Sequence, residues 1–234
     1  KDEIGLPIDK EELGSSLTDL LEYVQSIVQF IVHIHSDEES NENKCDLSAW
    51  EHDIIEIDCL KIIRRFLEID DNPPIQQIVD AIPGLAECLT GNDKECKLEA
   101  ANSLKSILAR GTEEHRKMVI DAGVIPSFTR LLGSSIDSVA KVALLALVDI
   151  ITCGTKKQID DMVEYNDIYR RLVGLLDSKD DDCVEGSLRL LAIVAKDRVQ
   201  DVVRAGLLPH LVRLLMIPDQ TDVILANCSS LYRG

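Results

Sequence analysis

A short apolar segment recurs four times along the chain, and this repeat constrains the fold more than any other feature. Three copies begin at Pro83, Pro126 and Pro209, and one begins at Arg170 without a proline. The copies read PGLAECL, PSFTRLL, RRLVGLL and PHLVRLL, and their starts are 43, 44 and 39 positions apart. A period of about 40 residues is typical of proteins that stack one supersecondary unit upon the next.

Each copy is followed by the same series of signals. A polar turn comes first, and then a longer apolar stretch with a period of 3.6 residues, such as residues 139–153, which indicates a buried helix. Gly111 and Gly154, each followed by Thr, suit the end of one helix and the start of the next. No alternating strand pattern competes. The sequence therefore predicts an all-α fold, a right-handed α-solenoid of about five repeats of the armadillo/HEAT class, in which stacking lets a chain with only 3% aromatic residues bury its aliphatic core.

The charge is spread unevenly, which suggests an irregular first repeat within a single domain. Residues 1–72 hold 19 acidic and 6 basic residues, and an acidic stretch at 36–43 is expected to form a loop. Residues 73–234 hold about four repeats. The chain begins without Met and ends at LYRG, inside an expected helix, so we expect it to be cut from a longer protein at both ends.

The net charge of −17 argues against nucleic acid as the main ligand, because phosphate attraction needs a basic surface. It favours a basic partner, or it serves solubility alone. No apolar run reaches the roughly 18 residues that a membrane helix needs. The seven cysteines are odd in number and form no C-x-x-C pair, so we expect reduced, mostly buried thiols.

Chemical sites are not indicated. His33, His35, Cys45 and His52 could form a zinc set, but their spacing lacks the closely spaced pairs that zinc sites use, and surface histidines are the better interpretation. The chain carries no phosphate-binding loop, no G-x-S-x-G and no H-E-x-x-H. We therefore expect no cofactor, no metal and no enzymatic activity.

Several segments resemble one family. The stretch PPIQQIVDA from Pro73, the preceding RRFL, the stretch GTEEHRKMVIDAGVIP from Gly111 and the final LYRG are similar to repeat boundaries and helix ends of importin-α (karyopherin-α). The resemblance implies a nuclear transport adaptor of cytoplasm and nucleus, whose concave groove binds extended Lys/Arg-rich nuclear localisation signals. It also implies importin-β as a partner where a basic segment precedes the repeats.

The family's groove uses a Trp followed four residues later by an Asn, one pair in each repeat. The Trp flanks Lys side chains and the Asn amide bonds the peptide backbone. The matching positions here are Asn102/Ser106, Leu145/Asp149, Leu188/Ala192 and Ala226/Ser230. None of them carries the family's residue, and the single Trp, Trp50, lies elsewhere. Three alternatives stay open: binding of basic signals, binding of a divergent peptide class, and an armadillo interaction scaffold without a transport role.

Overall fold

The computed structural model describes residues 22–31, 49–68, 75–165, 168–195 and 198–216, and within these ranges it contains helices and no strand. A first helix covers residues 22–31. The others are α2 (Ala49–Glu68), the 3-10 helix η1 (Ile75–Ala81), α3 (Ile82–Cys88), α4 (Lys94–Arg110), α5 (Glu113–Asp121), α6 (Val124–Leu131), α7 (Asp137–Cys153), α8 (Lys156–Tyr165), α9 (Ile168–Leu176), α10 (Asp181–Ala195), α11 (Val199–Arg204) and α12 (Leu208–Leu215).

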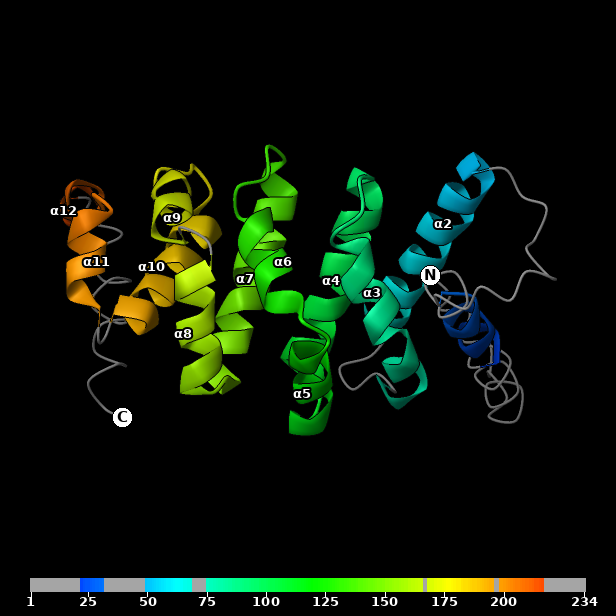
Figure 1. Cartoon of the computed structure of the whole chain (residues 1–234). Helices are drawn as coiled ribbons and strands as arrows, with labels where there is room; N and C mark the ends of the chain where they lie inside the picture. Colours follow the sequence, from blue (N-terminus) through cyan, green and yellow to red (C-terminus); the bar gives the residue numbers. More distant parts are fainter. Residues whose placement is uncertain (1–21, 32–48, 69–74, 166–167, 196–197, 217–234) are drawn as a thin grey trace, which may run out of the picture.

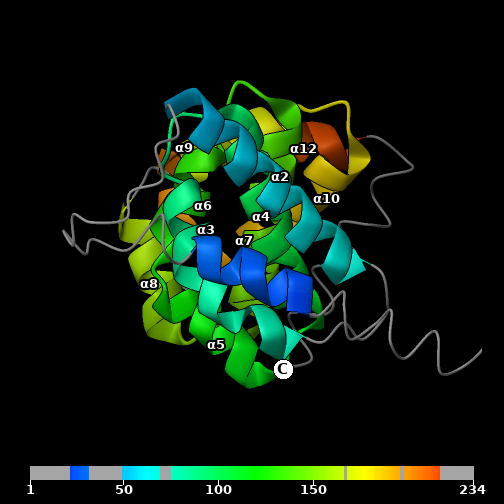
Figure 2. The same cartoon turned by 90° about the vertical axis from the view of Figure 1, so that its right-hand side faces the viewer.

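These helices form a repeating unit of two short helices and one long helix. The described part of the chain holds the units η1–α3–α4, α5–α6–α7 and α8–α9–α10, followed by α11 and α12. The units stand side by side in a row (Figure 1). Seen along that row, α3, α6 and α9 lie on one side and the long helices α2, α4 and α10 on the other (Figure 2). The predicted all-α solenoid is confirmed.

The long helices stack directly on one another, α2 on α4, α4 on α7 and α7 on α10. Leu104, Leu147 and Leu191 occupy the same place in successive units and are 0%, 0% and 4% exposed. They belong to one aliphatic core cluster that continues through the described units. Burial of this shared core holds the row together, because a single unit cannot cover its own apolar surface.

Local signals mark where the helices begin and end. Asp93 precedes α4, and its carboxylate accepts a hydrogen bond from the Cys96 backbone N–H at 2.8 Å. Thr112 and His115 form a reciprocal capping box at the start of α5, with both distances 3.3 Å. Gly111 ends α4 in an extended conformation, where an added Cβ would collide with the Ile107 carbonyl oxygen. The Gly-Thr pair therefore lies at the predicted helix boundary. Gly111 is needed there because a side chain would collide with the preceding turn of α4, and not because its backbone is left-handed.

The left-handed conformation occurs instead at the Ala-Gly boundaries. Gly123 and Gly206 both have φ of 76°, which L-residues adopt with strain. Each one lies between the first and second short helix of its unit, or of the unit's described part. Gly123 and Gly206 hold equivalent positions in two repeats, and their backbones have the same φ.

Four cysteines in the described part of the chain, Cys59, Cys88, Cys96 and Cys183, are buried thiols, as expected. Burial is the main cause that raises the pKa of the Cys88 thiol, and its hydrogen bond to Glu56 at 3.1 Å adds to the effect. Burial is also the main cause that raises the pKa of the Cys59 and Cys183 thiols. The thiols of Cys59, Cys88 and Cys183 are therefore held in the protonated, unreactive form.

Other expectations fall outside the described residues. They include the boundary at residue 72, the acidic loop at 36–43 and the side chains of the candidate zinc set. Within the part that the structure describes, no three His, Cys, Asp or Glu side chains gather as metal ligands. No described helix is long and apolar enough to cross a membrane.

Candidate functional site

The long helices present one solvent-facing stripe in each unit. On α4, Asn102 and Ser106 are partly exposed, while Leu104 between them is buried. On α7, Leu145 and Asp149 hold the same two places and are also partly exposed. Positions four apart lie on one helix face, so each pair points the same way. We call the row of such positions on α4, α7 and α10 the long-helix face.

On α10 the stripe lies one residue later than the sequence match placed it. Leu188 is only 6% exposed and belongs to the core. Arg189 is exposed and Ile193 is partly exposed, so this pair stands where Leu145 and Asp149 stand on α7. Ala192, also partly exposed, borders the stripe.

The repeat spacing contains the signal that places Arg189. Pro126 and Arg170 are 44 positions apart, and the same step from Leu145 leads to 189 rather than 188. The remaining predicted pair, Ala226 and Ser230, lies outside the described residues.

Asp149 stands at the middle of the long-helix face and is surrounded by positive charge. Burial raises the pKa of its carboxyl, and the charges of Lys105, Arg116 and Arg189 act in the opposite direction. These bases come from α4, α5 and α10 on either side of α7. The Asp149 carboxylate therefore already interacts with cationic side chains of the protein itself.

The acids between α2 and α4 are likewise engaged. Glu99 is 8% exposed and binds the Arg64 guanidinium at 2.5 Å, and Arg64 also binds Glu68 at 2.8 Å. Lys61 binds Glu95 at 2.6 Å. The two pairs Lys61–Glu95 and Arg64–Glu99 tie the helices together at successive turns.

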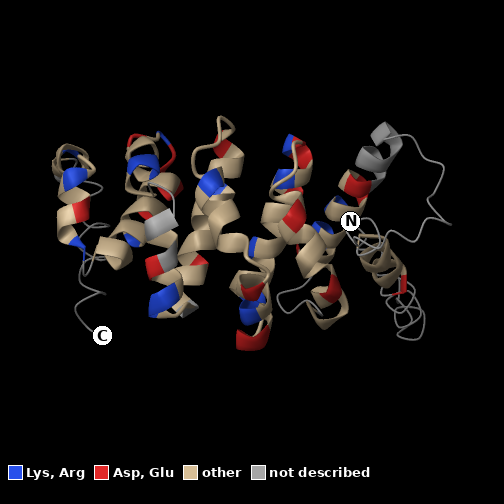
Figure 3. Ribbon diagram, in the orientation of Figure 1, with Lys and Arg blue, Asp and Glu red and all other residues tan. Residues whose placement is uncertain are grey.

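A similar arrangement joins α7 to α10. The Lys141 ammonium lies 2.8 Å from Asp180 and 2.7 Å from Asp182 at the start of α10. Further along α10, Arg189 binds Glu185 at 2.5 Å. Blue and red residues alternate along the described helices rather than forming a field of one sign (Figure 3).

This pairing changes what the long-helix face can attract. An incoming Lys or Arg side chain would have to displace Lys61, Arg64 or Lys141 from carboxylates they already bind. The acids named on the described long helices are therefore already engaged by bases of the protein, although Arg64 and Lys141 each face two carboxylates and leave one negative charge over.

Comparison with known proteins fits this architecture. The Armadillo/beta-catenin-like repeat model matches residues 112–151, which coincide with the unit α5–α6–α7. Importin subunit alpha-1a of Oryza sativa subsp. japonica is 27% identical over 216 residues, covering 73% of this chain and 41% of the rice protein. Importin subunit alpha-2 of Arabidopsis thaliana is 36% identical over 106 residues, covering 44% of this chain and 20% of that protein.

The chain therefore contains an armadillo repeat and is similar, as a divergent sequence, to importin-α subunits. It spans about two fifths of the length of the rice relative it matches. Among solved structures, a designed armadillo repeat protein in complex with the peptide (KR)4 is similar, with a TM-score of 0.65 and 20% identity over 95% of each chain. A computationally designed armadillo repeat protein for modular peptide recognition has a TM-score of 0.66 at 21% identity, over 96% of this chain and 94% of that one. At this identity the two designed proteins support the fold alone.

Proposed function

We propose that the long-helix face binds an extended linear peptide and that this importin-α-like protein is a non-enzymatic adaptor in nuclear transport. The observation that carries the proposal is the stripe that recurs on three stacked long helices, with Asn102, Leu145 and Arg189 at its equivalent positions. A regular stripe of exposed positions suits a regular ligand, and an extended peptide repeats its side chains at a fixed spacing.

The residues of the stripe favour a divergent peptide over a Lys/Arg-rich signal. The described long helices carry none of the Trp/Asn pairs that would flank and clamp such a signal. The acids beside these positions already pair with Lys or Arg side chains of the protein. Each lost amide clamp removes about 1 kcal/mol, so three losses weaken a ligand by roughly two powers of ten. The ligand we propose has few basic residues and places apolar side chains against Leu145 and Ile193.

Peptide selection followed by binding measurements tests the proposal. Random linear peptides displayed on phage are selected on the immobilised chain, and the selected peptides are labelled for fluorescence anisotropy. A Lys/Arg-rich nuclear localisation peptide and its equal-charge scramble are measured beside them, at low and at physiological salt. We expect salt-resistant binding of the selected peptides, and binding of the basic peptide that disappears at physiological salt and matches its scramble.

The variant Leu145→Lys locates the site. It should weaken the selected peptides at least tenfold, because it places a charged group where an apolar contact is made. Leu208→Lys is the matched control, since Leu208 is 46% exposed on the short helix α12. Equal effects of the two variants, or no selected peptide at all, would contradict the proposal.

The transport role needs its own measurement. Importin-β is mixed with the protein, and complex formation is followed by size-exclusion chromatography. A complex supports the adaptor role. Its absence, together with retained peptide binding, would leave an armadillo scaffold whose likeness to importin-α is one of descent.

A further inference from the structure

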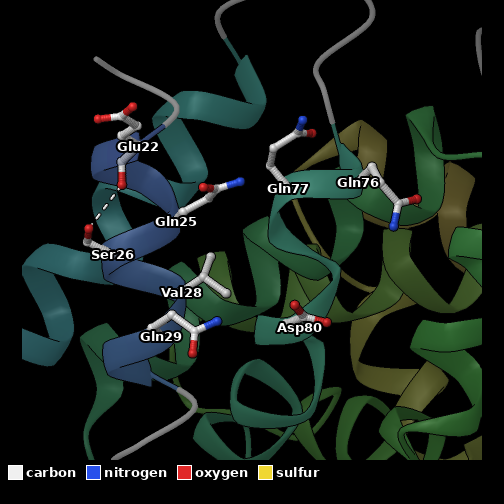
Figure 4. A pocket seen from close by; sticks show the side chains of 8 residues that line it. All are labelled: Glu22, Gln25, Ser26, Val28, Gln29, Gln76, Gln77 and Asp80. Atoms are coloured by element: carbon white, nitrogen blue, oxygen red, sulfur yellow. Dashed lines mark hydrogen bonds between the residues drawn. The ribbon is translucent and has the colours of Figure 1, made fainter. Parts of the chain in front are cut away.

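A polar cleft lies at the N-terminal end of the described row, away from the long-helix face. It is formed between the helix at residues 22–31 and η1, and its volume is about 450 Å³ (Figure 4). Four glutamines line it, Gln25 and Gln29 from the first helix and Gln76 and Gln77 from η1. We call it the amide cleft.

The cleft follows from two amphipathic helices that pack through their apolar sides. Val24, Ile27 and Ile31 of the first helix are buried, as are Ile75 and Ile78 of η1. The first helix turns residues 22, 25, 26 and 29 toward the cleft, a spacing of three and four that marks one helix face. The polar faces are thus held opposite each other by the core beneath them, and Gln25 and Gln29 reach toward the η1 side (Figure 4).

Hydrogen bonds show which groups of the cleft are already used. The His115 Nδ1 accepts from the Thr112 backbone N–H, so its Nε2 carries the proton that is donated to Gln76 Oε1 at 3.3 Å. This orients the Gln76 amide and leaves its two N–H donors for other partners. The Gln77 Oε1 is buried and accepts no hydrogen bond from any described residue. A buried acceptor without a donor is costly, and this oxygen becomes available to a ligand N–H when the Gln77 side chain turns into the cleft.

The charge of the cleft narrows the ligand class. Asp80 lies across from Gln29, and Glu22 lies at the upper edge (Figure 4). The lining contains no Lys, Arg or aromatic residue. Phosphates and nucleic acids would meet carboxylates with no compensating base, and a sugar or nucleobase would find no ring to stack on. What remains is a ligand with amide-like donors and acceptors and a positive charge.

A peptide main chain has this complement, because each peptide group offers one N–H and one C=O to a side-chain amide. We propose that the amide cleft binds a short extended peptide segment that carries a lysine or arginine. The glutamine amides pair with the main chain, and Asp80 receives the cationic side chain. This site is separate from the long-helix face and does not depend on the function proposed for it.

The probe is the blocked tripeptide acetyl-Ala-Lys-Ala-amide, titrated into the ¹⁵N-labelled chain and followed by ¹H–¹⁵N correlation spectra, in which glutamine side-chain amides are visible. Acetyl-Ala-Glu-Ala-amide is titrated in parallel. We expect saturable shifts confined to residues 22–31 and 75–81 and to the four glutamine side chains, and clearly weaker binding of the Glu peptide.

Three variants make the assignment. The double change Gln25→Ala/Gln29→Ala should weaken the Lys peptide by about tenfold or more, as the loss of two main-chain hydrogen bonds predicts. Asp80→Asn should abolish the preference for Lys over Glu while leaving residual binding. Gln200→Ala, at an exposed glutamine on α11, is the matched control and should change nothing. Circular dichroism verifies that each variant keeps its helices.

Shifts scattered over acidic residues throughout the chain, equal binding of the two peptides, or full binding by the double glutamine variant would each overturn the proposal. Leu145→Lys separates the two sites. It should weaken the peptides selected on the long-helix face at least tenfold while leaving the tripeptide titration unchanged.

Discussion

Helices α4 and α7 hold the same place in successive units, and each is 17 residues long, yet they are built differently. Helix α4 begins at a side-chain cap, Asp93, whereas α7 begins after Ile136 and has no side-chain cap. The outward stripe of α4 is polar, with Asn102 and Ser106, and that of α7 contains Leu145. Both helices nevertheless end at an extended glycine and stack on the same kind of neighbours. Core burial is therefore the shared requirement, and caps and stripes are free to vary.

The joints on either side of this pair differ in a related way. Between α2 and α4, the Glu99 side chain is 11% exposed where it meets Arg64. Between α7 and α10, Lys141 meets Asp180 and Asp182, whose side chains are 42% and 68% exposed. The same kind of ion pair thus stands in two dielectric environments, and its energetic importance should follow the burial.

The largest effect is expected from the shared core. Leu147→Ala should lower the free energy of unfolding by about 2–5 kcal/mol, because it opens a cavity at a fully buried site. Leu104→Ala removes the equivalent side chain of α4 and should fall in the same range. Urea denaturation followed by circular dichroism measures both. If the capped helix α4 tolerated its change at almost no cost, the equivalence of the two cores would be broken.

The buried joint comes next. Arg64→Met should cost about 2–3 kcal/mol, because it leaves the Glu99 carboxylate buried without its guanidinium. The double variant Arg64→Met/Glu99→Met removes both charges and should regain most of this loss in the same urea measurement. A double variant as unstable as the single one would show that packing of the arginine side chain, and not the charge, closes the joint.

The cap of α4 is the third point of comparison. Asp93→Ala should cost about 1 kcal/mol at pH 7, because it removes the acceptor for the Cys96 N–H. That hydrogen bond is the main cause that lowers the pKa of Asp93 below its usual value. The stabilisation is therefore complete above the unfolded-state pKa of about 3.9 and is lost as the pH falls through the lower folded-state pKa.

Unfolding measured from pH 7 to pH 3 tests this sign. The difference between wild type and Asp93→Ala should stay constant down to about pH 5 and shrink below pH 4. Asp93→Asn keeps a capping oxygen and should show only a small loss with no such pH dependence. A difference that grew on acidification would refute the assignment of the cap.

The smallest effect is expected at the exposed joint. Lys141→Met should leave the midpoint of urea denaturation within experimental error of wild type, since water screens an ion pair whose acids are this exposed. Added salt should not separate the two proteins. A loss as large as that of Arg64→Met would mean that the position in the repeat, rather than burial, determines the strength of these pairs.

The sequence alone predicted the repeat, the all-α class and the helix boundaries, because each depends on local signals such as Pro83, the Gly111-Thr112 pair and a 3.6-residue apolar period. It also placed Asn102 and Leu145 on the exposed side of their helices. It missed Arg189 because the match was carried forward by one position too few, and a single residue turns a helical side chain by about 100°.

Other features could not be predicted because they depend on distant segments. The pairing of Arg64 with Glu99 joins residues 35 positions apart. The sequence contains no local signal that these two charges meet. The amide cleft likewise needs the helix with Gln25 and Gln29 to pack beside η1, which carries Gln76 and Gln77. Glutamines have no strong positional signal of their own, so only the tertiary structure reveals the cluster.

Two buried cysteines can report how often individual repeats open. Cys96 in α4 and Cys183 in α10 occupy the same place in their units and are 6% and 4% exposed, while Val139 holds that place in α7. A thiol-labelling reagent can react with either cysteine only during a transient opening of the unit that shelters it. Labelling rates at the two positions, measured by mass spectrometry on the unmodified protein, would therefore show how often the unit with α4 and the unit with α10 open and whether they open at the same rate.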